Sequence, residues 1–184
     1  FSDHIDKIVS FEIPSSSRGF FDNNNWDDGA GDFDSGHGTH VAGSVLGDGT
    51  NSNGLIMGAA PNAILEFQAI EQYVNWKSYY ETNYDVEDGY YLYGIPDDLS
   101  DLFGPAARNG SRIHTNSWGS SVSGKYTSES MTADLNAHIY DEMLIIFAAG
   151  NEGEDRSGDG EVDFDSIGSP ASAKNVLTVG ASEN

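Results

Sequence analysis

The run from Met143 to Ala149 constrains the fold of this chain more than any other stretch, because every residue in it is apolar. A strand with one face in water alternates apolar and polar residues, whereas a strand covered on both faces reads as a continuous apolar run. The run is far shorter than the roughly 20 residues that cross a bilayer. Residues 176–179 repeat the pattern near the end of the chain. Both segments therefore predict strands of a sheet that is buried on both faces.

Segments with the patterns of strands and helices alternate along the rest of the chain. Strands are predicted at residues 7–13, 63–70 and 112–117, and helices at residues 41–46, 99–109 and 128–141. The last helix carries Met131, Leu135 and Ile139 at the spacing of an amphipathic helix. This alternation predicts an α/β fold, a parallel sheet flanked by helices, with its active site at the carboxyl ends of the strands. The length of 184 residues fits one domain.

The charge of the chain excludes some classes of partner. Acidic residues number 30 against 8 basic ones, which gives a net charge of -22. Nucleic acids and anionic membranes need a basic surface, so the sequence predicts binding to neither. The acidity fits a solvated surface or a set of calcium sites, and composition does not separate these two interpretations. The absence of cysteine rules out disulfides and a cysteine nucleophile.

Two stretches have little helical or strand periodicity. Residues 15–35 are rich in Ser, Asn, Asp and Gly and predict a long surface loop. Residues 72–94 hold most of the tyrosines of the chain, together with Trp76 and several acidic residues. Such an aromatic cluster more often packs under a long loop than forms a binding platform. We therefore expect the aromatic side chains to pack against each other under a loop, and contact with a ligand is the less favoured interpretation.

A histidine between two glycines stands at the start of the first predicted helix, in the block Asp34-Ser35-Gly36-His37-Gly38-Thr39-His40. The glycines let other backbone approach closely and leave the His37 ring free to face a cleft, as a general base requires. The spacing of His37 and His40 also fits a metal pair, and a lone histidine also fits a packed core residue. These three interpretations stay open on this block alone.

Three further blocks follow in order. They are His114-Thr115-Asn116-Ser117-Trp118-Gly119, then Phe147-Ala148-Ala149-Gly150-Asn151-Glu152-Gly153, then the stretch from Ser169 to Ala181. Asn151 lies between glycines at the end of an apolar run, which is a way to aim an amide N–H donor into a cleft. Together with the histidine block, they closely resemble the subtilisin-like serine peptidases, and within them the large alkaline proteases of bacilli and marine bacteria.

The resemblance implies a role for each of these residues. His37 becomes the general base and Asn151 the side-chain donor to the oxyanion, whereas His40 becomes a packed structural residue. The pocket for the side chain before the scissile bond has two walls, and Glu152 lies near its rim and could admit a basic side chain. The residues of the walls are Ser117, Trp118 and Gly119 on one side and Ala148, Ala149 and Gly150 on the other.

The resemblance places the other two triad members outside this chain, with the aspartate before Phe1 and the serine nucleophile beyond Asn184. The sequence is thus expected to be a partial peptidase domain, residues 1–184, incomplete at both ends. The complete protein is then expected to be a secreted, monomeric serine endopeptidase that acts on polypeptides. The alternative is a homologue that binds peptide strands without cutting them, and the sequences on either side of this chain would discriminate the two.

One acidic stretch resembles a calcium loop of the EF-hand type. Counted from Asp155, the loop has oxygen side chains at places 1, 3, 5 and 9, glycine at 6 and an apolar residue at 8. Ser166 departs from the pattern, because place 12 calls for a bidentate carboxylate. A structural calcium ion and a solvated acidic loop are both open. The candidate ligands are Asp155, Ser157, Asp159, Glu161 and Asp163.

Overall fold

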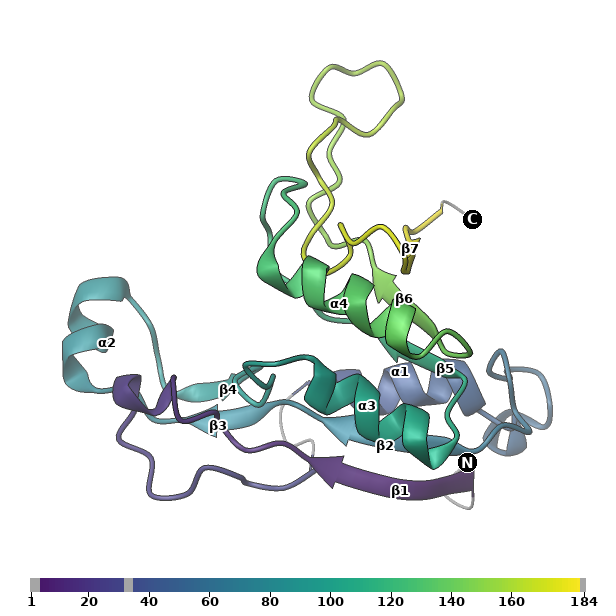
Figure 1. The fold of residues 1–184 in the computed structure, drawn as a ribbon, viewed down its shortest axis with the longest axis horizontal. Helices are drawn as coiled ribbons and strands as arrows, with labels where there is room; N and C mark the ends of the chain where they lie inside the picture. Colours follow the sequence, from purple (N-terminus) through teal and green to yellow (C-terminus); the bar gives the residue numbers. More distant parts are fainter. Residues whose placement is uncertain (1–3, 32–34, 183–184) are drawn as a thin grey trace. The chain divides into compact units, whose positions relative to one another are not determined.

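A computed structural model describes residues 4–31 and 35–182, so Asp34 of the histidine block lies outside the described residues. The chain divides into two compact units, residues 1–97 and 98–184. Each unit contains parallel strands and helices (Figure 1), and the predicted α/β class with parallel strands flanked by helices is confirmed.

In the first unit, two parallel strands and one helix carry the histidine block. Strand β1 (Ile5–Ser10) pairs in parallel with β2 (Leu65–Ala69). Helix α1 (His37–Leu46) contacts β2 and buries Ala42 and Leu46. It begins four residues earlier than the sequence pattern predicts, because Gly36 supplies a left-handed turn immediately before His37. A short 3-10 helix, η3 (Thr50–Ser52), follows α1.

The tyrosine-rich region forms a structure of its own in the first unit. Strands β3 (Gln72–Val74) and β4 (Gly89–Tyr91) pair antiparallel, and helix α2 (Ser78–Tyr84) lies between them in sequence. A second 3-10 helix, η2 (Arg18–Phe20), comes from the preceding loop. The packing predicted for the aromatic residues is confirmed, because they surround a buried cluster. Its members are Ile13, Phe21, Val74 and Trp76, with Trp26, Tyr80, Val86, Tyr91 and Tyr93 packed against them.

Replacing Trp76 with alanine should destabilise the first unit more than any exposed aromatic substitution. The Trp76 ring makes edge contacts with Phe21 at 4.8 Å and with Tyr93 at 5.8 Å between centroids. Truncating a buried ring of this size costs about 3 to 5 kcal/mol of unfolding free energy. Tyr79→Ala is the matched control, since Tyr79 is 63% exposed. Denaturant unfolding of both variants measures the difference, and equal losses would contradict the core role of Trp76.

In the second unit, three parallel strands form one sheet in the order β5-β6-β7. They are β5 (Ile113–Asn116), β6 (Leu144–Ala148) and β7 (Leu177–Val179). Helix α3 (Ser100–Asn109) ends at Gly110, whose φ of 101° confirms the predicted glycine stop. Phe103 of α3 contacts the rings of His114 on β5 and Phe147 on β6, so α3 covers part of the sheet.

Helix α4 (Ser128–Ile139) is present as predicted, but its buried face differs from the expected one. Met131, Leu135 and Ile139 are each more than half exposed. The buried positions are Ser130, Ala133 and Asn136. Polar groups on this face are hydrogen bonded, with Asn136 Nδ2 donating to Ser100 Oγ at 3.0 Å and the Ser130 and Ser172 hydroxyls 2.8 Å apart. Among the described residues, Asn136 Oδ1 is buried without a partner. Hydrogen bonding, and not the apolar stripe, therefore orients α4.

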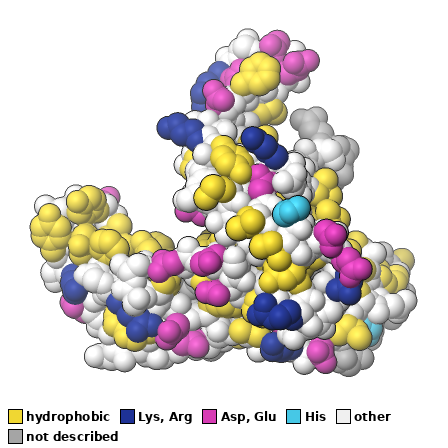
Figure 2. Space-filling view, viewed as in Figure 1, with side chains coloured by type: hydrophobic (Ala, Val, Ile, Leu, Met, Phe, Trp, Pro, Cys, Tyr) yellow, Lys and Arg dark blue, Asp and Glu magenta, His cyan; other side chains and the backbone are white. Residues whose placement is uncertain are grey.

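The surface carries dispersed charge. Asp and Glu side chains are scattered over the visible face and are not gathered in one place (Figure 2). The ion pair of Arg112 with Glu142, at 3.3 Å, joins two exposed side chains and adds little stability. Within residues 4–31 and 35–182, the helices are all too short or too polar to cross a membrane.

Candidate active site

His37 is the first residue of α1 and its side chain is exposed. Gly36, with φ 67°, turns the chain into the helix, and the His37 backbone N–H donates to Ser35 Oγ at 3.2 Å. Among the described residues, the His37 ring makes no hydrogen bond. The turn is held through the backbone, and the ring nitrogens stay available for a reacting group.

The glycine after His37 is required by a neighbouring strand. A Cβ atom on Gly38 would lie 3.0 Å from Cζ of Phe67 on β2, closer than ordinary side-chain contacts. A larger residue here would push the start of α1 away from β2. Gly38 therefore fixes the position of the His37 backbone within the first unit.

His40 lies one turn along α1, and its side chain is exposed. The expected packing of His40 against the interior is therefore wrong, because this face of α1 is turned toward solvent. The metal-pair interpretation finds no third ligand, since no group of three His, Cys, Asp or Glu side chains comes together in the part of the chain that the structure describes. The general-base interpretation of His37 stays a prediction.

In the second unit, the predicted pocket walls lie at one edge of the sheet. Strands β5 and β6 are parallel neighbours with Asn116 opposite Phe147, so the residues that follow them emerge side by side. Ser117, Gly119, Ala148 and Gly150 are exposed, as walls that receive a ligand must be. The Trp118 ring is fixed by an edge contact with Phe147, at 5.3 Å between centroids.

A third segment joins the two walls, and the sequence patterns did not single it out for this role. Gly168 N–H donates to Ala149 O at 2.8 Å, and Ser169 exchanges two backbone hydrogen bonds of 2.9 Å with Ser120. A Cβ atom on Gly119 would lie 2.7 Å from Ser169 O, so the approach requires glycine. Ser169 and Pro170 begin the last block of the family resemblance, but the sequence analysis gave neither them nor Gly168 a role beside the walls.

Asn151 follows Gly150 directly after the β6 strand end. Gly150 has φ 110°, a conformation that favours glycine, and it turns the chain so that the Asn151 side chain is exposed. Ala149 N–H donates to Val179 O of β7 at 2.9 Å, which anchors the base of this turn. Among the described residues, the Asn151 amide has no hydrogen-bond partner. Glu152, predicted at the pocket rim, is also exposed.

The acidic loop after Asn151 closes on itself. The Asp155 carboxylate accepts N–H bonds from Gly158 at 2.6 Å, Asp159 at 3.2 Å and Gly160 at 2.8 Å. These bonds, that of Gly160 foremost, hold the pKa of Asp155 below its ordinary value. A carboxylate with a lowered pKa supports this turn at neutral pH and loses its effect as the pH falls through that lowered pKa.

The candidate calcium ligands are not brought together in this arrangement. Within the described ranges no three acidic or histidine side chains converge, and the backbone N–H groups use the oxygens of Asp155. Asp163 Oδ2 accepts from the backbone of Arg156 at 2.9 Å. As it lies in the structure, the loop is a self-capped turn, and calcium binding to it stays a prediction. Asp side chains in such turns bond to nearby backbone N–H groups, and these bonds compete with the binding of a cation.

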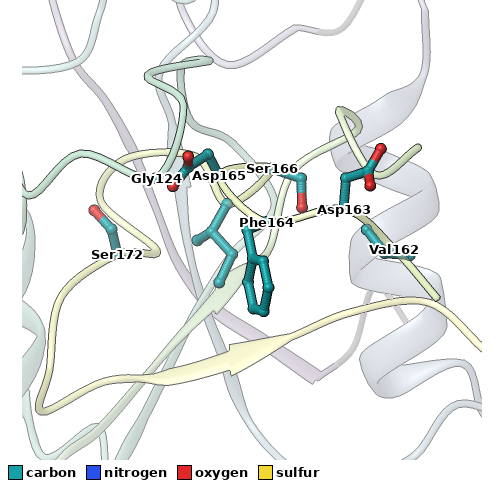
Figure 3. A pocket seen from close by; sticks show the side chains of 8 residues that line it. Gly124, Val162, Asp163, Phe164, Asp165, Ser166 and Ser172 are labelled. Atoms are coloured by element: carbon teal, nitrogen blue, oxygen red, sulfur yellow. The ribbon is translucent and has the colours of Figure 1, made fainter. Parts of the chain in front are cut away.

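An open hollow of about 480 Å³ lies in the second unit (Figure 3). Asp163, one of the candidate metal ligands, lies at this hollow. Its lining consists of Gly124, residues 162–167 and Ser172.

The fold is of the α/β class with parallel strands, and it carries an exposed histidine at a helix start and an exposed asparagine after a strand end. Comparison with known proteins identifies the family. The subtilase family, Peptidase_S8, matches residues 1–184, and the chain belongs to this family.

Relatives come from a eukaryote and a bacterium. The chain is 32% identical over 159 residues to "Serine protease/ABC transporter B family protein tagB" of Dictyostelium discoideum, covering 83% of this chain and 7% of that protein. The tagD protein of the same organism is 31% identical, with 8% of its length covered. "Subtilisin" of Bacillus sp. (strain TA39) is 32% identical over 150 residues, covering 81% of this chain and 30% of that protein. The chain thus spans less than a third of these relatives.

Proposed function

We propose that the complete protein containing this chain is a serine endopeptidase. The observation that carries the proposal is a pair of exposed polar groups in a subtilase chain, the His37 ring and the Asn151 amide, for which the described residues provide no hydrogen-bond partner. Each group is held by its backbone and leaves its side chain free. This is the state that a general base and an oxyanion donor require before a substrate binds.

In the proposed reaction, His37 takes the proton of a serine hydroxyl as that oxygen attacks the peptide carbonyl carbon. His37 then gives the proton to the leaving amine. The Asn151 amide donates to the carbonyl oxygen as it becomes negative. Water repeats the sequence on the acyl-enzyme, with His37 as base again. The serine and the orienting aspartate are expected outside residues 1–184.

The substrate is proposed to be a polypeptide strand. Main-chain groups of a peptide would pair beside residues 117–119 and 148–150, with the side chain before the scissile bond between these walls. The small residues of the walls leave room for a bulky apolar side chain. The charge of -22 disfavours polyanions, and we propose a secreted monomer that binds neither nucleic acid nor membranes.

The test is hydrolysis by the complete protein of two chromogenic peptides that differ only in Phe or Asp before the scissile bond. We expect faster hydrolysis of the Phe peptide, with kcat/KM higher by at least tenfold. The alternative function, peptide binding without cleavage, predicts saturable binding of both peptides by fluorescence anisotropy and no release of chromophore. Neither binding nor hydrolysis of either peptide would contradict both functions.

Calcium binding by residues 155–163 stays a prediction. The hydrogen bonds within the loop give this prediction a measurable consequence. A cation would have to draw the Asp155 carboxylate from Gly158 and Gly160, so their amide NMR signals should shift on calcium addition. Binding to the folded state alone stabilises it. Asp159→Ala should then lower Tm of the complete protein in calcium and not in chelator. The exposed Asp141→Ala variant is the control, and equal losses in calcium and in chelator would contradict a bound cation.

A further inference from the structure

Hydroxyl groups gather between the start of α4 and the segment that leads to β7. They belong to Thr127, Ser130, Ser169 and Ser172, and the side chains of Ser130 and Ser169 are buried. In Figure 1 the segment before β7 passes beside the first turn of α4. These hydroxyls concern the candidate pocket, because Ser169 belongs to the segment that joins the two predicted walls.

Ser169 gives its one hydroxyl proton to Thr127. The hydroxyl oxygens of Thr127 and Ser169 lie 2.5 Å apart, and that of Thr127 also lies 2.6 Å from a carboxylate oxygen of Glu129. The bond from Thr127 holds the pKa of Glu129 below its ordinary value, so at neutral pH this carboxylate only accepts. Thr127 therefore donates to Glu129, and its oxygen accepts from Ser169.

A second hydroxyl bond between the same two segments runs in the opposite direction. Ser172 Oγ donates to the carbonyl oxygen of Lys125 at 2.8 Å, so its single proton is already used. The Ser130 hydroxyl, 2.8 Å from that of Ser172, is then the donor of this pair. The wall segment is thus held to the start of α4 by one bond that it donates and by one that it accepts.

The backbone hydrogen bonds of Ser169 act elsewhere. They join Ser169 to Ser120, and the neighbouring Gly168 N–H donates to Ala149 O, so these bonds stay among the strand ends and do not reach α4. A Cβ atom on Gly119 would lie 2.7 Å from Ser169 O. At so close an approach, a small shift of Ser169 changes the space beside Gly119.

We propose that Ser169 and Thr127 are positioning residues for substrate specificity, because their hydroxyl bond sets the depth of the space between the predicted walls. This inference rests on the proposed function. A bulky apolar side chain of a substrate reaches the Gly168–Ser169 backbone, whereas a methyl group does not. Loss of the hydroxyl bond should therefore weaken the binding of a Phe peptide and leave that of an Ala peptide unchanged.

The experiment uses the complete protein and two chromogenic peptides that differ only in Phe or Ala before the scissile bond. Ser169→Ala and Thr127→Val each remove one hydroxyl, whereas Thr127→Ser keeps it. In the first two variants KM for the Phe peptide should rise about fivefold, the effect of one lost hydrogen bond, with kcat unchanged. KM for the Ala peptide should not change, and Thr127→Ser should behave like the unchanged protein.

Asn136→Ala is the matched control. Asn136 also lies on the buried face of α4, but its amide donates to Ser100 of α3 and not to the wall segment. This variant should lower Tm and leave KM for both peptides unchanged. If Ser169→Ala lowers Tm but keeps the preference for Phe over Ala, the hydroxyl serves stability alone and the proposal is overturned.

A measurement without substrate separates this proposal from the proposed function. Amide hydrogen exchange at Ser120 and Gly168, whose N–H groups bond across the walls, should be faster in Ser169→Ala than in Asn136→Ala. Equal exchange in the two variants would overturn the positioning role.

The unchanged protein provides the last comparison. If it binds both peptides without hydrolysing them, and Ser169→Ala weakens binding of the Phe peptide alone, then the endopeptidase function fails and the positioning role holds. If the unchanged protein neither binds nor hydrolyses the peptides, both proposals fail. Fluorescence anisotropy and chromophore release, measured on the same preparations, distinguish these results.

Discussion

Replacing His37 with alanine in the complete protein should remove nearly all catalysed peptide hydrolysis at every pH. The ring is the only group proposed to carry a proton between the serine and the leaving amine, and it has no substitute within α1. The expected fall in kcat is about 10⁶-fold, the size seen when a subtilisin loses its triad histidine. Activity that remains should reflect substrate binding and the oxyanion donors alone.

His40→Ala is the matched control for this variant, because both histidines are exposed and lie on the same helix. We expect a kcat within a few-fold of the unchanged protein and a similar Tm for both variants. Steady-state kinetics from pH 5 to 10 provide the measurement. An active His37→Ala protein, or equal losses in the two variants, would show that His37 is not the base.

Asn151→Ala should lower kcat by about 10² to 10³ with little change in KM, the loss typical of removing one oxyanion donor from a subtilisin. The amide is unbonded in the free chain and is expected to bind the oxyanion better than the ground-state carbonyl. An interaction that strengthens only in the transition state appears in kcat and not in KM.

The competing role for Asn151 is to shape the turn after Gly150. In that case Asn151→Ala would disturb the neighbouring wall, raise KM and lower Tm, with little effect on kcat. Kinetics and thermal melting on the same preparation separate the two roles. Asn151→Asp adds a second comparison, since it keeps the size of the side chain and replaces the amide donor with a carboxylate that repels the oxyanion.

Much of this fold was predictable where one physical signal dominates. The apolar run at Met143 predicted β6, and Gly110 predicted the end of α3. The expected burial of the sheet on both faces is wrong for the described residues, because exposed and buried residues alternate along β6 and Leu177 and Val179 of β7 are about half exposed. The stripe of Met131, Leu135 and Ile139 misled, since the hydrogen bonds of Ser130 and Asn136 turn α4 the other way. Tertiary partners of polar residues are not visible in a sequence pattern.

The candidate site was also predictable only in part. His37 and Asn151 stand at element ends with glycine beside them, and both proved exposed. The role of Gly168 depends on a backbone bond to Ala149, far away in sequence, so local pattern gave no sign of it. His40 was expected inside because it lies one turn along the helix from His37, yet its side chain is exposed.

The three tryptophans of this chain are divided between its two units, so a change in tryptophan fluorescence can be assigned to one unit. Trp26 and Trp76 belong to the aromatic cluster of the first unit, whereas Trp118 stands in the second unit against Phe147. Within residues 1–184, a Trp118→Phe variant keeps tryptophan in the first unit only. The difference in fluorescence between the unchanged protein and this variant would report on Trp118 in the pocket wall. Peptide binding and loss of packing against Phe147 could then be followed in time without an added dye.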